Sequence, residues 1–235
     1  MNELILISAL IFIYGTILLS YRLFGKSGLY CMSVLATILA NIEVVILIRA
    51  FGIEQTLGNV LFASTFLITD ILSECEGRKS ANKAVLLGIF SAIFFLILTQ
   101  SWGLYEASEN DTMQRAAIQL FSYTSRIIFA SLIAYIISQF FDIWLYHTWW
   151  KFTEIKSGSH QKFLWLRNNG STLISQFVNT LIFTFLAFAG TYSFPIVLNI
   201  FISSYLIYAV AGLLDTPIVY LARKSKSNHQ ELLND

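Results

Sequence analysis

The sequence predicts an all-α membrane protein, a bundle of about seven transmembrane helices, and three observations support that prediction. Of the 235 residues, 56% are hydrophobic and only 12% are charged, whereas soluble domains usually carry roughly 25% charged residues. The apolar residues gather in segments near the ~20 residues that a helix needs to cross a bilayer. Basic residues alternate from one connection between segments to the next. One soluble core could not bury so much apolar surface, so we expect an integral membrane protein.

Seven apolar segments follow one another along the chain, and the third is the shortest. They are 3–21, 28–49, 57–73, 83–101, 118–142, 170–190 and 196–221. The first has no basic stretch before it and no small-residue cleavage signal, so we expect it to be retained as a span. We see no internal repeat and no second domain. Residues 1–235 are therefore expected to form one membrane domain with a flexible polar tail from about residue 224 to 235.

The charges in the connections predict the orientation of the bundle. The basic residues after the odd-numbered segments are Arg22, Lys26, Arg78, Lys79, Lys83, Lys151, Lys156, Lys162, Arg167, Arg223, Lys224 and Lys226. The connections after the even-numbered segments hold only Arg49 and Arg115, together with acidic residues. By the positive-inside rule, the N-terminus lies outside and the C-terminus lies in the cytoplasm. Six or eight spans would break this alternation, so the charges support the weak third span.

The sixth segment carries a stripe of polar residues. Thr172, Ser175, Gln176 and Asn179 are spaced by three, one and three residues, which places them on one face of a helix. Such a stripe must face protein or water. Hydroxyl groups in membrane helices often bond their own backbone, and amides often join two helices, so a purely structural role stays open beside a binding role.

Acidic residues near the hydrocarbon need an explanation, because a charge at the centre of the bilayer costs a few kcal/mol or more. Glu43 and Arg126 fall at similar depth in their segments, at about 1.5 Å per residue, and we expect them to form an ion pair. Asp70, Asp142 and Asp215 all fall near the cytoplasmic ends of their segments. They either cap helices at the interface and meet basic loop residues, or surround an inner vestibule.

Several function classes lack their motifs in this sequence. There is no glycine-rich phosphate loop, no HExxH and no metal-spaced cluster of His and Cys, and we find no Ser–His pair for hydrolysis. No basic stripe interleaved with aromatic residues suggests nucleic-acid binding. We therefore expect neither an enzyme nor a bound cofactor or metal. Buried carboxylate, amide and hydroxyl groups suit a small planar polar solute such as a guanine-like base, although other small solutes fit equally well.

One stretch also resembles a known family. The residues Thr65 to Glu74, followed by Gly77-Arg78-Lys79, are similar to those of the queuosine precursor transporters, which were earlier grouped with vitamin uptake transporters. Further similar segments are Leu39 to Glu43, Leu57 to Phe62, Ser138 to Asp142, Trp165 to Asn169 and Ser171 to Gln176. The likeness covers nearly the whole chain, with several segments in the same order.

The resemblance implies import of 7-deazaguanine bases across the cytoplasmic membrane. It also implies a helical bundle similar to the substrate-binding subunits of energy-coupling-factor vitamin transporters. The residues expected to contact the base are Asn41, Glu43, Arg126, Gln139, Thr172, Gln176 and Asn179. Asp70 and Asp142 are expected to gate the path or to couple a proton. Members of that family usually carry an acid where this chain has Asn179, which bears on the base preferred and on proton coupling.

Two rival functions stay open from the sequence. The chain could be a substrate-binding subunit that needs a partner ATPase, since it has no ATP site of its own. It could instead be a seven-helix receptor or scaffold, although its short cytoplasmic connections argue against that role. The sequence leaves open the precursor base, the driving ion and whether the chain forms a homo-oligomer or joins a coupling module.

Overall fold

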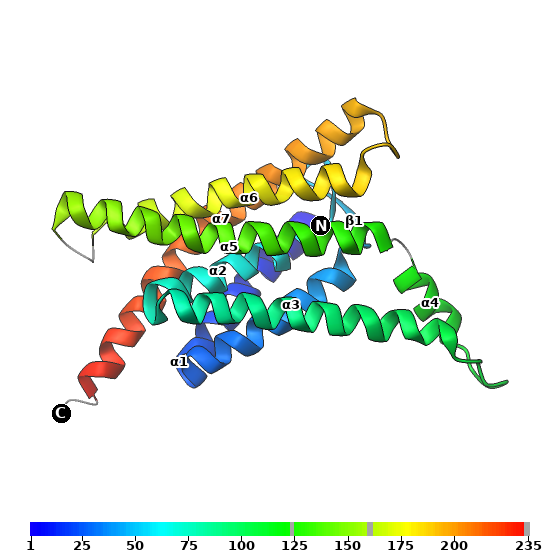
Figure 1. Cartoon of the computed structure of the whole chain (residues 1–235), viewed down its shortest axis with the longest axis horizontal. Coiled ribbons are helices and arrows are strands. Elements are labelled where there is room, and N and C mark those ends of the chain that lie inside the picture. The colour runs from blue at the N-terminus through cyan, green and yellow to red at the C-terminus, as the bar shows by residue number, and fades with distance from the viewer. Residues whose placement is uncertain (123–124, 159–161, 233–235) are drawn as a thin grey trace.

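The structure is a computed structural model that describes residues 1–122, 125–158 and 162–232. Its α-helices are α1 (Asn2–Glu43), α2 (Asn59–Glu76), α3 (Arg78–Ser101), α4 (Gln114–Ser122), α5 (Ser125–Ser157), α6 (Leu164–Phe188) and α7 (Phe194–Leu232). A short 3-10 helix η1 (Trp102–Leu104) follows α3, and two strands, β1 (Leu47–Ala50) and β2 (Ile53–Thr56), lie between α1 and α2. The long helices run alongside one another (Figure 1). The predicted all-α bundle is therefore confirmed, with one small β-hairpin added.

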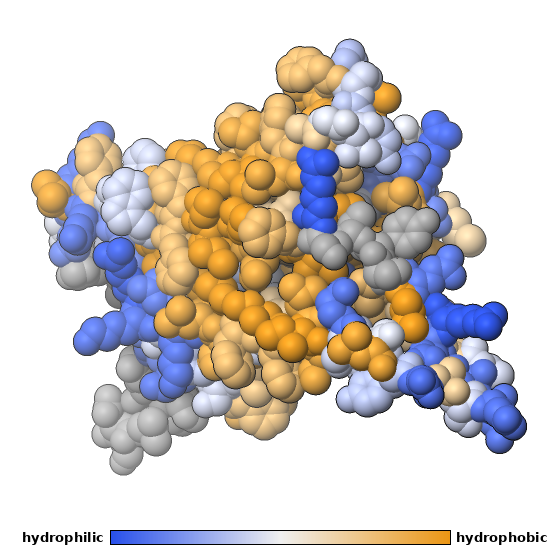
Figure 2. Space-filling model, turned by 45° about the vertical axis from the view of Figure 1, so that its right-hand side comes forward, coloured by the Kyte–Doolittle hydropathy of each residue, from blue (hydrophilic) through white to orange (hydrophobic). Residues whose placement is uncertain are grey.

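The bundle has the apolar surface of a membrane protein. Five of the described helices are long and apolar enough to cross a membrane, namely α1, α3 with η1, α5, α6 and α7. Apolar side chains cover the middle of the molecule and polar ones lie toward its two ends (Figure 2). Apolar side chains in the middle are those that can face hydrocarbon, so the chain is a multi-pass membrane protein.

Helix α1 consists of two legs that run in opposite directions. Gly25 has φ 58° and ψ −144°, which breaks the helix, and a Cβ at Gly28 would clash with the carbonyl oxygen of Ser20. The side chain of Asn2 donates to the carbonyl of Arg49 at 2.9 Å. The second leg therefore ends close to the N-terminus, where the first leg begins. These two legs correspond to the first two predicted spans.

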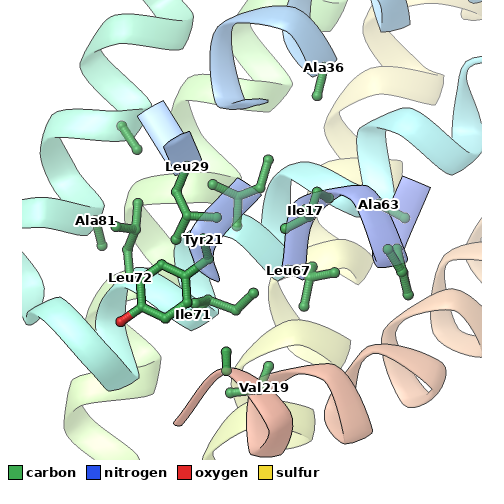
Figure 3. Packing of buried hydrophobic residues seen from close by; sticks show 14 of the residues in the cluster. Ile17, Tyr21, Leu29, Ala36, Ala63, Leu67, Ile71, Leu72, Ala81 and Val219 are labelled. Atoms are coloured by element: carbon green, nitrogen blue, oxygen red, sulfur yellow. The ribbon is translucent and has the colours of Figure 1, made fainter. Parts of the chain in front are cut away.

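Helix α2 lies at the centre of the bundle, although it was the weakest predicted span. Every residue from Asn59 to Ser73 is buried, and α1, α3, α5 and α7 pack around it. Its Leu67, Ile71 and Leu72 meet side chains from the neighbouring helices (Figure 3). Glycine permits the positive φ of 82° at Gly77, where α2 ends and α3 begins. A helix that is buried on all sides needs no lipid-facing apolar stripe, so hydropathy alone marks it poorly.

The structure moves several predicted boundaries. The second span was expected to reach residue 49, but α1 ends at Glu43 and the chain enters the β-hairpin. Phe51 and Gly52 both have positive φ, as a two-residue hairpin turn with the strand twist requires. Helix α6 begins at Leu164 instead of residue 170, which makes Arg167 helical and not part of a loop. Helix α7 extends as far as Leu232, beyond the predicted end of the seventh segment at residue 221.

The two ends of the bundle differ in charge. We call the end where α2 stops at Gly77 the basic end; α6 begins there, and Arg223 of α7 reaches Glu74 there. We call the end with β1, β2 and the N-terminus the hairpin end (Figure 1). The basic residues predicted to be cytoplasmic include Arg167, Arg223 and Lys226, which meet at the basic end. The orientation across the membrane stays a prediction of the positive-inside rule.

Candidate functional site

The polar stripe of α6 faces the interior of the bundle. Thr172, Ser175 and Gln176 have no exposed surface, and Asn179 is 4% exposed. Helix α6 packs against α5 and α7, and the stripe also reaches α2, because Thr172 donates to Asp70. Helical spacing placed these side chains on one face, and the fold turns that face toward protein. The stripe is therefore part of an internal polar region and not of the lipid-facing surface.

Three fully buried carboxyl groups from three helices meet the polar face of α6. Asp70 of α2 accepts a hydrogen bond from Thr172 at 2.8 Å. Asp142 of α5 accepts one from Ser175 at 2.6 Å. Asp142 and Asp215 lie close enough to Asp70 for their charges to interact with it. Asp70 is fully buried and thus lies in the interior and not at an interface; a role in an inner vestibule stays a prediction.

The third carboxyl group, Asp215 of α7, accepts a hydrogen bond from the Asn168 amide at 2.7 Å. Asn168 also donates to Thr216 at 3.1 Å, so the first turns of α6 are tied to α7. We call the group of Asp70, Asp142, Asp215, Asn168 and Gln176 the carboxylate cluster. Four helices, α2, α5, α6 and α7, supply it. The cluster therefore lies where these four helices meet.

The carboxylate cluster has unused hydrogen-bonding capacity. One oxygen of each carboxyl group has no hydrogen-bond partner, namely Oδ1 of Asp70, Oδ2 of Asp142 and Oδ2 of Asp215. The carbonyl oxygen of the Asn168 side chain and both amide atoms of Gln176 are also without partners. Buried polar atoms usually have a partner in a folded protein. The cluster can therefore accept several N–H donors and, through Gln176, donate to one carbonyl group.

Gln139 and Asn179 already use hydrogen bonds within the protein. The Gln139 amide donates to Thr65 at 2.7 Å, and its carbonyl accepts from Thr69 at 3.2 Å. These two bonds join α5 to α2. The carbonyl of Asn179 accepts a hydrogen bond from Ser138 at 3.2 Å. Both predicted residues thus lie in the internal polar region, where their amide groups join neighbouring helices.

Arg126 has other partners than the one predicted. Its guanidinium donates to the carbonyls of Leu186 and Ala189 and to the Thr191 hydroxyl. The carbonyls of Leu186 and Ala189 lie at the end of α6, where backbone carbonyls lack partners within the helix, so Arg126 caps that helix. The predicted ion pair with Glu43 is not among its contacts, because the chain after α6 folds back over the arginine. Leu186 is about four turns from Thr172, which places Arg126 far from the carboxylate cluster.

Asn41 and Glu43 also lie toward the hairpin end. The Asn41 amide donates to the carbonyl of Thr37 at 2.8 Å, and its oxygen accepts from Ser131 at 3.5 Å. Glu43 is the last residue of α1, immediately before the β-hairpin. The structure therefore brings together Thr172, Gln176, Asp70 and Asp142, and it separates Asn41 and Glu43 from them.

A cleft opens at the hairpin end. It has a volume of about 610 Å³ and includes Val44, Thr56, Gln119, Phe183, Phe188 and Tyr192 in its lining. A second cavity of about 10 Å³, the space of a single water, shares Val44 and Phe183 with the cleft. The small cavity is lined in addition by Asn59, Asn179 and Tyr208. The two spaces are neighbours, and Asn179 of the polar stripe lines the smaller one.

Asn59 is held at this inner cavity by two hydroxyl groups. Its carbonyl oxygen accepts hydrogen bonds from Thr56 at 3.0 Å and from Tyr208 at 3.2 Å. Its amide nitrogen is buried without a partner. Sequence reasoning did not single out Asn59, Tyr208 or Asn168. Asn59 and Asn168 lie in segments already quoted for the resemblance, and one tyrosine among 11 gave no signal.

The polar groups of the internal polar region suit the binding of a small molecule. Within the ranges that the structure describes, no group of three His, Cys, Asp or Glu side chains could hold a metal ion. The polar groups are instead carboxylates, amides and hydroxyls in an apolar bundle. Such sites recognise small molecules by hydrogen bonds at a few fixed points.

Comparison with known proteins gives a consistent result. The family described as "Putative vitamin uptake transporter" matches residues 56–222. A protein of Bacillus subtilis (strain 168) named "Probable queuosine precursor transporter" is 38% identical over 214 residues, which is 91% of this chain and 91% of that protein. No solved structure matches the chain. The family match covers more than half of the chain and includes α2, α5, α6 and the part of α7 up to residue 222, and these helices supply the carboxylate cluster. This chain is therefore a membrane transporter that belongs to the vitamin uptake transporter family.

Proposed function

We propose that this chain imports 7-deazaguanine precursors of queuosine across the cell membrane. The name of the Bacillus subtilis relative supports the substrate class. The observation that carries the proposal is the unused hydrogen-bonding capacity of the carboxylate cluster. A planar base of the guanine type offers ring N–H and amino donors next to a carbonyl acceptor, and the cluster offers the complementary groups.

The contacts of such a base follow from the free atoms of the cluster. The partnerless oxygens of Asp70 and Asp142 would accept the N–H donors. A charged acceptor makes the stronger kind of hydrogen bond, worth about 1.5–3 kcal/mol. The amide of Gln176 would donate to the carbonyl of the base. Thr172 holds Asp70 in position through its 2.8 Å hydrogen bond.

The route of entry runs from the hairpin end in this proposal. The cleft of about 610 Å³ can admit a small heterocycle, and three aromatic residues, Phe183, Phe188 and Tyr192, line it. Aromatic rings stack favourably on planar solutes, with about 0.5–1.5 kcal/mol per pair of rings beyond the burial of their surface. The inner cavity beside Asn59 and Asn179 has the space of a single water, so it would have to widen before the base could reach Gln176. The positive-inside rule places the hairpin end outside, which makes this direction an import.

Proton coupling is the finer part of the proposal. Asp70 and Asp142 are both fully buried and interact with each other. Two neighbouring buried carboxylates repel each other unless they share a proton. A base that donates to both would displace that proton, so binding and proton movement become linked. Asp142→Asn should therefore leave binding measurable but make uptake independent of an imposed proton gradient. Uptake by this variant that still follows the gradient would exclude Asp142 as the coupling group.

The deciding experiment measures queuosine in tRNA. Cells that cannot make the precursors would express the chain and receive each candidate base at low concentration. Restored queuosine with one base, and its loss in a Gln176→Leu variant, supports the proposal. An Asn110→Asp variant in the exposed loop before α4 is the matched control, because it changes an amide far from the cluster. Verified membrane expression without restoration by any base would overturn the substrate class.

Flux in liposomes tests whether a coupling module is needed. We expect the purified protein alone to transport the base into liposomes when a proton gradient is imposed. Binding without flux would show instead that the chain is a substrate-binding subunit of a larger transporter. A stable protein partner without binding of any base would show a receptor or scaffold.

A further inference from the structure

One buried carboxylate joins four helices at the basic end. Glu74, near the end of α2, has a side chain that is only 2% exposed. Both of its oxygens accept from Arg167 of α6, at 2.9 and 2.6 Å. Arg223 of α7 donates to it at 3.2 Å, and the Tyr146 hydroxyl of α5 donates at 2.7 Å. Glu74 is therefore the shared contact of α2, α5, α6 and α7.

Arg167 is fixed as firmly as Glu74. Its side chain has no exposed surface, and its guanidinium lies 4.4 Å from the centre of the Trp150 ring. A further nitrogen of the group donates to the Lys162 carbonyl at 2.9 Å. A two-point contact between guanidinium and carboxylate sets distance and angle together. This geometry holds α6 against α2 in one defined position.

A second ion pair, between Glu76 and Lys226, also lies at the basic end. Glu76 accepts from the Tyr21 hydroxyl of α1 at 2.8 Å and pairs with Lys226 of α7 at 3.2 Å. Lys226 also donates to the carbonyl of Cys75. The last turn of α2 is thus bonded to α1, α5, α6 and α7. A solute that leaves at the basic end has to part some of these contacts.

The Glu74 contacts adjoin the carboxylate cluster directly. Glu74 lies one helical turn beyond Asp70 on α2. Arg167 precedes Asn168, whose amide donates to Asp215. The Glu74 contacts therefore separate the carboxylate cluster from the basic end, whereas the hairpin end has the cleft of about 610 Å³. The structure thus has a cleft at the hairpin end and charged contacts that hold the basic end closed.

We propose that Glu74 is the latch of the basic end, and that its pairs with Arg167 and Arg223 must part before a solute is released there. This inference rests on the proposed transport function for its direction. Separating a buried ion pair is strongly unfavourable, because it leaves a buried charge without its partner. The closed state therefore persists until the solute, or a rearrangement of the adjoining carboxylates, gives α6 or α7 another stable position.

The chain contains its own reporter for this movement. Cys75 is next to Glu74 and only 7% exposed, while Cys31 is exposed. In a Cys31→Ser background, a maleimide applied to the cytoplasmic face of inside-out vesicles reacts with Cys75 only when the basic end opens. We expect slow labelling of the parent and at least tenfold faster labelling of Glu74→Gln. Glu54→Gln in the β-hairpin is the control and should label as the parent does.

A second reporter separates a latch from general loosening. Tyr192 lines the cleft and is 50% exposed, so Tyr192→Cys, in a background without the two native cysteines, reports the hairpin end. If the two ends open in alternation, Glu74→Gln should slow the labelling of this cysteine from outside while it speeds that of Cys75. Faster labelling at both ends would mean that the variant only loosens the bundle, and it would overturn the latch.

The test does not depend on a correct substrate. Labelling rates need no base, so failure of queuosine restoration leaves the latch result intact, and unchanged labelling leaves the transport result intact. If Glu74→Gln does not insert into the membrane, Arg223→Gln decides, because the Arg223 side chain is itself 30% exposed and its removal keeps the contact between Glu74 and Arg167. We expect this variant to label Cys75 about threefold faster; labelling at the parent rate in a folded variant would refute the proposal.

Discussion

Replacing Gln176 by Leu should make the protein more stable and the transporter worse. Both amide atoms of Gln176 are buried without hydrogen-bond partners, and the side chain has no exposed surface. An unsatisfied buried polar group costs about 1–3 kcal/mol. Leucine has a similar size, and the neighbouring Gly212 leaves room on one side, because a Cβ there would only reach ordinary contact with Gln176. The substitution removes the penalty without opening a large cavity.

The size of both effects can be worked from the contacts. Relief of about 1–3 kcal/mol raises the unfolding temperature by about 2–12 °C, at about 2–4 °C per kcal/mol for a chain of this size. Loss of the one neutral hydrogen bond that Gln176 donates to the base, at about 0.5–1.5 kcal/mol, weakens binding by roughly 2- to 12-fold. Stability and affinity should thus change in opposite directions.

Two measurements on the same purified sample test this prediction. Thermal unfolding in detergent gives the stability without ligand, and titration calorimetry gives the affinity for the base that restores queuosine. Asn110→Asp serves as the control for both. A lower unfolding temperature together with unchanged affinity would refute the reasoning, because it would show that Gln176 is a structural residue whose partners lie within the protein.

Three further substitutions separate binding roles from structural ones. Thr172→Val removes the donor to Asp70 and should lower initial uptake rates about tenfold, since the loss of a hydrogen bond to a charged group costs about 1.5–3 kcal/mol; Thr184→Val, three turns along α6, should not. Asn59→Asp keeps the acceptor for Tyr208 but loses the free amide donor, so the KM for uptake should rise with little change in maximal rate; an unchanged KM would remove Asn59 from the route. Arg126→Gln should lower the unfolding temperature, because the carbonyls at the end of α6 lose their cap, while the KM stays the same; a raised KM with normal stability would restore Arg126 to the binding site.

Local features of the sequence were sufficient for the membrane bundle. Each span depends on about 20 consecutive residues, so composition and length reveal it without knowledge of the neighbours. The polar face of α6 was equally local, because helical spacing alone puts Thr172 and Gln176 on one side. The positive charges in the connections, which supported the third span, can also be read directly from the sequence. The family resemblance agreed with the later match over residues 56–222.

Contacts between distant segments required the tertiary structure. Depth along the spans suggested that Arg126 would meet Glu43, but depth does not say which helices are neighbours, and the end of α6 lies closer. Hydropathy ranked α2 last among the spans, although it is the central helix, because a segment wrapped by other helices need not be uniformly apolar. Partners such as Glu74 and Arg167 lie 93 residues apart. Sequence therefore determined which residues could form helices in a membrane, and packing of those helices decided which carboxylates share a cluster and which are paired with arginine.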